Sequence, residues 1–189
     1  MIIDDIKKFI FIHTPKTGGT SITEFFSGVG RKDPLPLEHH ITYEQCLKEK
    51  PEIKDYFSFA FVRNPWNRVV SSYHDTTILE RTTEKTLSFK EFVKQTLPHH
   101  LSKKPEHNTI HYFPCYYFLG DDINFIGRTE TIIEDFTKIQ KILSLEGNLP
   151  HARNSSRKEK EYRNFYDVET KQIVEELYIK DIEEFGYEF

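Results

Sequence analysis

Three short apolar runs, each followed by a segment of helical periodicity, constrain the fold of this chain most strongly. The runs cover residues 8–13, 56–62 and 123–127, and they are rich in the aromatic and β-branched side chains of buried strands. Strands that alternate with helices typically form a parallel sheet whose faces the helices cover. We therefore expect an α/β fold over residues 1–189, a single-domain, three-layer structure with a central parallel β-sheet flanked by helices.

Capping residues mark several of the expected helices. Thr42 with Gln45, and Ser88 with Glu91, have the spacing of the capping box that begins a helix. Near the C-terminus, apolar side chains that recur on one helical face predict one long helix over residues 168–185.

Charge and composition exclude several classes of protein. The net charge is −4, which argues against a general surface for nucleic acid. Cys46 and Cys115 are far apart, lack the spacing of metal ligands and are expected to be reduced. Charges interrupt the N-terminal stretch, and no run is long and apolar enough to span a bilayer. We expect a cytoplasmic protein without stable membrane insertion and without a bound metal.

The sequence PKTGGTS, residues 15–21, follows the first apolar run and precedes a helical pattern. A strand, a glycine-containing turn and a helix N-terminus together make an anion site, because free backbone N–H groups and the helix dipole face the ligand. Lys16 adds a positive charge, and Thr17, Thr20 and Ser21 add hydroxyl groups. The pattern is not a Walker A loop, which requires Gly-Lys-Ser/Thr at its end. The alternative interpretation is an ordinary tight turn with a helix cap.

A second phosphate-like feature is the sequence RNPWNRVVSSY, which follows the second apolar run. Arg63 stands where that run ends, and ligands of parallel α/β sheets bind outside the carboxyl ends of the strands. Arginine suits bidentate binding of phosphate, and Ser71 lies two turns into the next expected helix. A structural salt bridge at Arg63 and close helix packing at Ser71 are the alternatives. Together the two features indicate a ligand with two separated phosphate groups.

These two motifs resemble those of the carbohydrate sulfotransferases of the heparan and chondroitin type, including 2-O-sulfotransferase-like enzymes and their small bacterial relatives. The resemblance continues in order through HHITYEQ, INFIGRTE and LPHARNSSRKEKEY, so it covers nearly the whole chain. It implies a P-loop-like fold and a single sulfotransferase domain. It also implies transfer of a sulfuryl group from 3′-phosphoadenosine 5′-phosphosulfate (PAPS) to a hydroxyl of a saccharide or glycoconjugate. The other product is adenosine 3′,5′-bisphosphate (PAP), and no metal is required.

The resemblance assigns a role to each matching residue. The cradle of the 5′-phosphosulfate comprises Lys16, Thr17, Gly18, Gly19, Thr20 and Ser21. Arg63 and Ser71 become the clamp of the 3′-phosphate. In the segment after LPH, this chain has Ser155 where relatives carry a basic residue, whereas Ser156 matches. Arg157 or Lys158 is then the source of the positive charge.

Sulfuryl transfer to an alcohol is an in-line displacement that demands mainly positioning and stabilisation of charge. Lys16 suits the charge that grows on the leaving phosphate, and a histidine or glutamate suits the base that accepts the proton of the acceptor hydroxyl. The resemblance points to His40 as this base, with His39 as its nearest rival. The remaining histidine candidates are His107, His111 and His151.

Two other functions stay open at this point. One is a nucleotide kinase or hydrolase of the P-loop type, against which the missing Gly-Lys-Ser/Thr and the lack of an evident Mg²⁺-binding aspartate argue. The other is a non-catalytic nucleotide-binding module that kept the pocket and lost turnover. The sequence identifies neither the acceptor nor the oligomeric state.

Overall fold

The structure is a computed structural model, which describes residues 1–28, 41–74, 87–106, 109–150 and 161–189. The chain divides into two compact units, residues 1–62 with 117–154 and residues 63–116 with 155–189, and each is described by itself. The expected single domain stays a prediction. In the described parts of the chain, no helix combines the length and the apolar composition needed to cross a bilayer.

The first unit is built on a four-stranded sheet in the order β1-β2-β3-β4. Its strands are β1 (Ile2–Asp4), β2 (Phe9–Ile12), β3 (Phe57–Val62) and β4 (Phe125–Arg128). The last three run parallel to one another, with Phe11 beside Phe59 and Phe59 beside Phe125. These are the strands predicted from the three apolar runs, and the α/β class is confirmed.

The edge strand β1 departs from the expected parallel sheet, because it pairs antiparallel with β2. A tight turn after β1 explains the reversal. The Asp4 carboxylate accepts hydrogen bonds from the amide groups of Ile6 at 2.9 Å and Lys7 at 2.7 Å. Lys8 then adopts a left-handed conformation with a φ of 55°. The sheet is therefore mixed, although most of its pairs are parallel.

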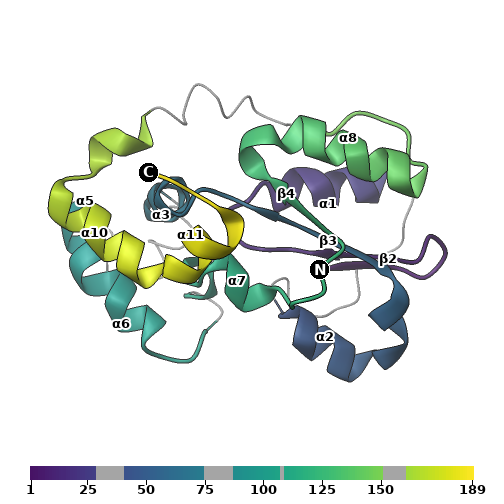
Figure 1. Cartoon of the computed structure of the whole chain (residues 1–189), viewed down its shortest axis with the longest axis horizontal. Helices are drawn as coiled ribbons and strands as arrows, with labels where there is room; N and C mark the ends of the chain where they lie inside the picture. Colours follow the sequence, from purple (N-terminus) through teal and green to yellow (C-terminus); the bar gives the residue numbers. More distant parts are fainter. Residues whose placement is uncertain (29–40, 75–86, 107–108, 151–160) are drawn as a thin grey trace. The chain divides into compact units, whose positions relative to one another are not determined.

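Phenylalanine side chains fill the layer between one face of the sheet and two helices, α1 (Gly19–Gly28) and α8 (Ile132–Leu143). Phe9, Phe11 and Phe59 point to this face and are completely buried. Phe25 of α1 meets Phe136 of α8 edge to face, with ring centroids 4.9 Å apart. Figure 1 shows α1 and α8 side by side on this side of the sheet. This aromatic layer sets the positions of both helices against the strands.

Helix α2 (Tyr43–Glu49) lies on the opposite side of the sheet (Figure 1). Ser58 alternates along β3 with the phenylalanines and so faces this side of the sheet, where its hydroxyl donates to Oδ1 of Asn124 at 3.0 Å. The predicted capping box is formed, because Thr42 Oγ1 accepts from the Gln45 amide at 3.1 Å and Gln45 Oε1 accepts from the Thr42 amide at 2.8 Å. Between α2 and β3 lies the 3₁₀ helix η1 (Pro51–Asp55). Helices thus flank both faces of the sheet, as expected.

The second unit is helical around an aromatic core. Its elements are α3 (Pro65–Tyr73), α5 (Phe89–Glu91), the π-helical turn η2 (Phe92–Thr96), α6 (Leu97–Leu101), η3 (Ile110–Tyr112), η5 (Tyr162–Phe165), α10 (Val168–Leu177) and α11 (Ile179–Phe185). The short helix α7 (Cys115–Phe118) links the two units along the chain. Trp66, Phe92, Tyr112 and Tyr178 are buried in this core. The capping box predicted at Ser88 is also formed.

The long helix predicted over residues 168–185 is two helices, α10 and α11, separated at Tyr178. The Tyr178 hydroxyl donates a hydrogen bond to the Tyr112 carbonyl at 2.6 Å. Its ring lies 5.3 Å from the guanidinium of Arg68. These buried contacts hold Tyr178 at a φ of −117° and a ψ of 23°, which interrupts the helix.

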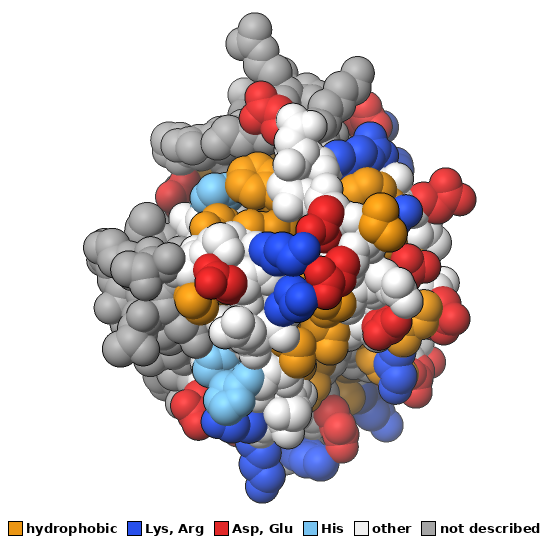
Figure 2. All heavy atoms as spheres, turned by 90° about the vertical axis from the view of Figure 1, so that its left-hand side faces the viewer, with side chains coloured by type: hydrophobic (Ala, Val, Ile, Leu, Met, Phe, Trp, Pro, Cys, Tyr) orange, Lys and Arg blue, Asp and Glu red, His pale blue; other side chains and the backbone are white. Residues whose placement is uncertain are grey.

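Exposed ion pairs connect α10 to α5 and η2 on the surface of this unit. Lys90 Nζ lies 2.7 Å from an Asp167 oxygen and 2.9 Å from a Glu169 oxygen, and Lys94 also bonds Glu169. Figure 2 shows basic and acidic side chains next to one another on this side of the molecule. Because all of these side chains are well exposed, solvent and salt weaken their attraction.

Candidate functional site

The loop between β2 and α1 has an unusual backbone conformation. Lys16 has a φ of 65° and Gly18 a φ of 84°, both in the left-handed region. Glycine adopts this region without a steric penalty, but a long side chain such as that of Lys16 rarely does. Backbone strain of this kind concentrates at ligand-binding sites, which makes Lys16 a candidate for such a role.

Both glycines of the loop lie close to neighbouring side chains. A Cβ atom on Gly18 would lie 2.7 Å from Cδ1 of Ile132, in addition to its left-handed φ. A Cβ atom on Gly19 would lie 2.0 Å from Nε2 of His13. The His13 ring also stacks on Phe11, with ring centroids 5.7 Å apart. His13 therefore shapes the loop by packing against Gly19.

Three buried threonines tie the loop to the ends of the parallel strands. Thr14 Oγ1 donates to the carbonyl of Phe61 in β3 and lies 2.9 Å from Thr17 Oγ1. Thr17 Oγ1 donates in turn to the Thr14 carbonyl at 2.9 Å. Thr129, in the 3₁₀ helix η4 (Thr129–Thr131), places its hydroxyl 3.0 Å from the carbonyls of both Thr17 and Val62. The Thr17 hydroxyl, which is expected to serve a ligand, thus bonds within the loop in this structure, and its role toward a ligand stays a prediction.

The N-terminus of α1 offers backbone donors at the end of this loop. Among the described residues, the amide groups of Gly18, Gly19 and Thr20 donate no hydrogen bond. The Ser21 amide bonds the Gly18 carbonyl at 3.1 Å, which closes the first turn. No acidic residue lies in this first turn, so the positive end of the helix dipole is uncompensated there. With the half-buried Lys16 two residues before Gly18, the loop has the donors and the charge of an anion site.

Helix α3 carries the second group of predicted residues in the other unit. Arg63 lies just before the helix, and its Nη2 donates to Oδ1 of Asn67 at 2.9 Å. Ser71 is half-buried, and its hydroxyl has no partner among the described residues. Asn67 and Ser71 are four residues apart and so share one side of the helix, and Arg63 contacts Asn67 from its position just before the N-cap. The sequence analysis assigns no role to Asn67, although the spacing of four residues from both Arg63 and Ser71 is visible in the sequence.

The start of α3 is held rigidly. Asn64 Oδ1 accepts from the amide groups of Trp66 at 3.1 Å and Asn67 at 3.3 Å, as an N-cap does. The Asn64 side-chain amide also donates to the Glu188 carbonyl at 2.8 Å. Pro65 occupies the first helical position, where its missing N–H has no consequence. Arg63 therefore precedes a helix end whose backbone is well anchored.

Arg68 is a buried arginine of the same helix, to which the sequence assigned no role. Its guanidinium donates to the carbonyl of Phe113 at 2.7 Å and lies 3.4 Å from the carbonyl of His111. Asp181 holds the next stretch of chain by accepting from the amide groups of Cys115 and Tyr116 at 2.7 and 2.8 Å. Burial raises the pKa of the Asp181 carboxyl, against the effect of the positive charge of Arg68. These two charged side chains fix residues 111–116 within the second unit.

Several predicted residues lie outside the described part of the chain. They are His39, His40, Ser156 and Arg157, together with the rival histidines His107 and His151. His111 is described and half-buried, and its carbonyl accepts from Ser72 Oγ at 3.4 Å. In the described residues, no three His, Cys, Asp or Glu side chains gather as ligands for a metal ion. Cys46 and Cys115 are both buried free thiols, as expected.

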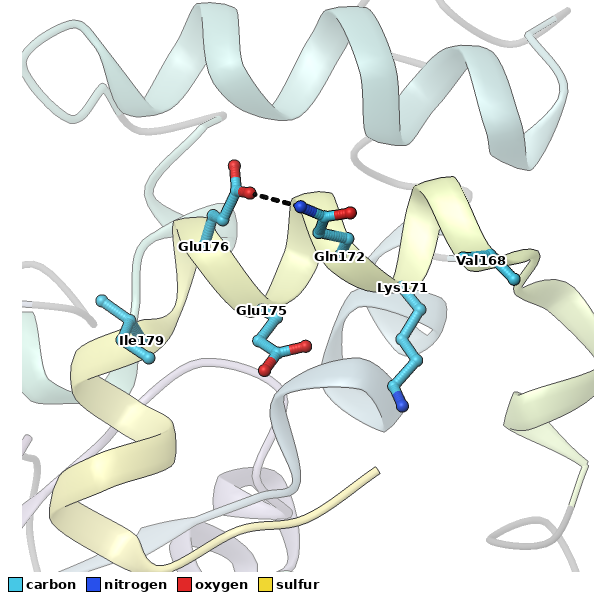
Figure 3. Close-up of a pocket in the computed structure, with 6 residues that line it drawn as sticks. All are labelled: Val168, Lys171, Gln172, Glu175, Glu176 and Ile179. Carbon is cyan, nitrogen blue, oxygen red and sulfur yellow. Dashed lines mark hydrogen bonds between the residues drawn. The ribbon is translucent and has the colours of Figure 1, made fainter.

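A hollow on the surface of α10 is separate from these motifs. It is lined by Val168, Lys171, Gln172, Glu175, Glu176 and Ile179. Figure 3 shows that all of these side chains come from α10 or the residues just after it, and that Gln172 bonds Glu176. None of the predicted site residues lines this hollow. The candidate residues described above thus form two separate groups, one in the loop before α1 in the first unit and one at the start of α3 in the second unit.

Comparison with known proteins identifies the family of the chain. The sequence model of a family described as the sulfotransferase family matches residues 1–188. A relative, carbohydrate sulfotransferase 12 of Mus musculus, is 24% identical to this chain in an alignment that covers 99% of the chain and 59% of the relative. The chain thus spans about three fifths of the length of that protein. No solved structure matches, so the P-loop-like topology stays a prediction. Because the family match extends over all but the last residue, the chain belongs to the sulfotransferase family.

Proposed function

We propose that this protein is a PAPS-dependent sulfotransferase that transfers a sulfuryl group to a hydroxyl of a saccharide or glycoconjugate. The observation that carries the proposal is the loop before α1, where a strained Lys16 precedes three amide groups without acceptors among the described residues. The family membership supports sulfuryl transfer, and the name of the mouse relative, a carbohydrate sulfotransferase, supports a carbohydrate acceptor.

The donor nucleotide has two anionic ends, and each of the two motifs suits one of them. We assign the 5′-phosphosulfate to residues 16–21, whose backbone amides and helix dipole favour an anion. We assign the 3′-phosphate to Arg63 and Ser71, because a guanidinium and a hydroxyl together provide several donors to phosphate oxygens. The Thr17 hydroxyl bonds within the loop in this structure, whereas Thr20 is exposed and Ser21 half-buried.

Sulfuryl transfer breaks the bond from sulfur to the phosphate oxygen and forms a bond from sulfur to the acceptor oxygen. Negative charge then grows on the 5′-phosphate of PAP, where the ammonium group of Lys16 stabilises it. The N–H groups of Gly18, Gly19 and Thr20 hold the same phosphate in place as the bond breaks. Lys16 therefore contributes more to the transition state than to the bound donor.

The proton of the acceptor hydroxyl needs a base, for which we propose His40, with His39 as its rival. A neutral imidazole accepts a proton readily near neutral pH. Replacing His40 with alanine is expected to lower turnover by roughly 10²–10⁴-fold, the usual contribution of a positioned base, without weakening PAP binding. We also assign Ser156 and Arg157 to the donor nucleotide, with Lys158 as the alternative source of charge.

The proposal is tested by titrating the protein calorimetrically with PAP, adenosine 5′-phosphate and Mg²⁺·ATP, followed by a screen of saccharide acceptors with PAPS in EDTA. A sulfotransferase binds PAP more tightly than either of the other nucleotides and sulfates at least one acceptor without a metal ion. Preferential binding of Mg²⁺·ATP indicates the kinase or hydrolase instead. Tight binding of PAP without transfer to any acceptor indicates a non-catalytic nucleotide-binding module.

A further inference from the structure

A contact at the start of α3 links Asn67, which has no assigned role, to Arg63 of the proposed 3′-phosphate site. Nη2 of Arg63 donates to Oδ1 of Asn67 at 2.9 Å. An arginine side chain only donates hydrogen bonds, so this contact settles which end of the Asn67 amide faces it. The Nδ2 group of Asn67 is left as a donor, and it bonds none of the described residues.

Asn67 is held firmly enough to orient the arginine. It is only 4% exposed, and its backbone amide bonds the capping oxygen of Asn64 at 3.3 Å. Its side chain therefore has little freedom, and its hydrogen bond restricts the orientation of the half-buried Arg63 guanidinium. A guanidinium that is already ordered loses less entropy when it binds a phosphate.

The chemical type of this partner is equally informative. An aspartate or glutamate at position 67 would also orient Arg63, but its negative charge would offset the charge that attracts a phosphate. A neutral amide accepts the hydrogen bond and leaves the positive charge intact. Ser71 follows one helical turn later on the same side, so charge, amide and hydroxyl form a polar stripe.

We propose that Asn67 is the positioning residue of the 3′-phosphate site, which holds the Arg63 guanidinium in its binding orientation while preserving its charge. This inference rests on the proposed function, because it takes the 3′-phosphate of the donor as the ligand of Arg63. It predicts that Asn67 determines how strongly the protein prefers a nucleotide with a 3′-phosphate over one without.

The test is a calorimetric comparison of PAP with adenosine 5′-phosphate, which lacks the 3′-phosphate. Asn67→Ala is expected to weaken PAP binding about 2- to 10-fold, the effect of releasing one ordered side chain, and to change adenosine 5′-phosphate binding less than about 2-fold. Asn67→Asp keeps the shape and the acceptor oxygen but adds a negative charge. It is expected to weaken PAP further than the alanine variant does, and the extra loss should shrink in high salt.

The background variant Arg63→Ala separates positioning from general support of the helix. In that background, Asn67→Ala should change the preference for PAP by less than about 2-fold, since the residue that it orients is gone. If Asn67→Ala proves too unstable, Asn67→Leu, which removes the acceptor oxygen but keeps much of the side-chain volume and adds no charge, supplies the same comparison. Equal weakening of both nucleotides by the Asn67 variants, or an equal loss with and without Arg63, overturns the inference alone. A wild-type protein that does not bind PAP overturns the proposed function and this inference with it.

Discussion

Two neighbouring serines of α3 are expected to respond oppositely to the same substitution. Ser71 is half-buried, and its hydroxyl has no partner among the described residues. Ser72 is 2% exposed, and its hydroxyl lies 3.4 Å from the carbonyl of His111. Ser71→Ala should therefore impair nucleotide binding, whereas Ser72→Ala should impair folding. Because both changes gain the same helix propensity, each variant is a matched control for the other.

The expected losses of PAP affinity and of stability follow from the group that each serine hydroxyl bonds, a phosphate for Ser71 in the proposed complex and the His111 carbonyl for Ser72. A hydrogen bond to a charged group contributes about 1.5–3 kcal/mol, so Ser71→Ala should weaken PAP binding roughly 10- to 150-fold. The neutral bond of Ser72 is long, and the His111 carbonyl retains Arg68 as a donor at 3.4 Å. Ser72→Ala should therefore lower the free energy of unfolding by about 0.5–1.5 kcal/mol and leave PAP affinity within about 2-fold.

Calorimetric titration with PAP and urea denaturation measure the two quantities on the same preparations. The expected result is a crossed pattern, in which one variant loses affinity and the other loses stability. Undiminished PAP affinity in Ser71→Ala would refute the assignment of the 3′-phosphate to this side of α3. A similar loss of affinity in both variants would show that the effect arises from a loosened helix.

Three further predictions concern the loop and the surface of the protein. Gly19→Ala should lower the free energy of unfolding by about 1–3 kcal/mol through its clash with His13, and adding His13→Ala should restore part of that loss in urea denaturation. Thr129→Val should lower the free energy of unfolding by about 1–3 kcal/mol in urea denaturation, because the carbonyls of Thr17 and Val62 lose a hydrogen-bond donor. The exposed control Thr137→Val should lower it by less than about 0.5 kcal/mol. The hydrogen bond from Lys90 lowers the pKa of Asp167, so this pair stabilises the protein above the unfolded pKa of about 4, and the effect is lost as the pH falls through the lowered folded pKa. Lys90→Met should flatten that acid dependence in thermal unfolding measured between neutral and acidic pH.

Local chemistry made much of the first unit predictable from the sequence. The three parallel strands are short, apolar and rich in phenylalanine, and each is followed along the chain by a helix. The capping boxes at Thr42 and Ser88 each depend on residues only three positions apart. The loop before α1 could also be predicted, because its glycines, lysine and hydroxyl-bearing residues are adjacent in the sequence. Features of this kind need no knowledge of distant contacts.

The features that the sequence did not reveal depend on tertiary contacts. Thr129 supports the loop from 112 residues away, and nothing in its local sequence distinguishes it from an ordinary turn residue. The interruption at Tyr178 results from a hydrogen bond to Tyr112, whereas the apolar periodicity continues through it. The antiparallel pairing of β1 could not be predicted, because β1 has only three residues and is followed by a charged turn. The contact between Asn67 and Arg63, on which the proposed role of Asn67 depends, is likewise not marked by any motif in the sequence.

The central claim is that this protein transfers a sulfuryl group from PAPS with the help of Lys16. The most direct measurement is the initial rate of PAP formation from PAPS in EDTA, in the presence and absence of a pool of saccharide acceptors. We expect acceptor-dependent formation of PAP by the wild-type protein. We also expect Lys16→Ala to reduce the rate by a larger factor than it reduces PAP affinity, because charge on the leaving phosphate is greatest in the transition state. A rate that does not depend on the acceptor, or a Lys16→Ala variant with undiminished turnover, would contradict the account.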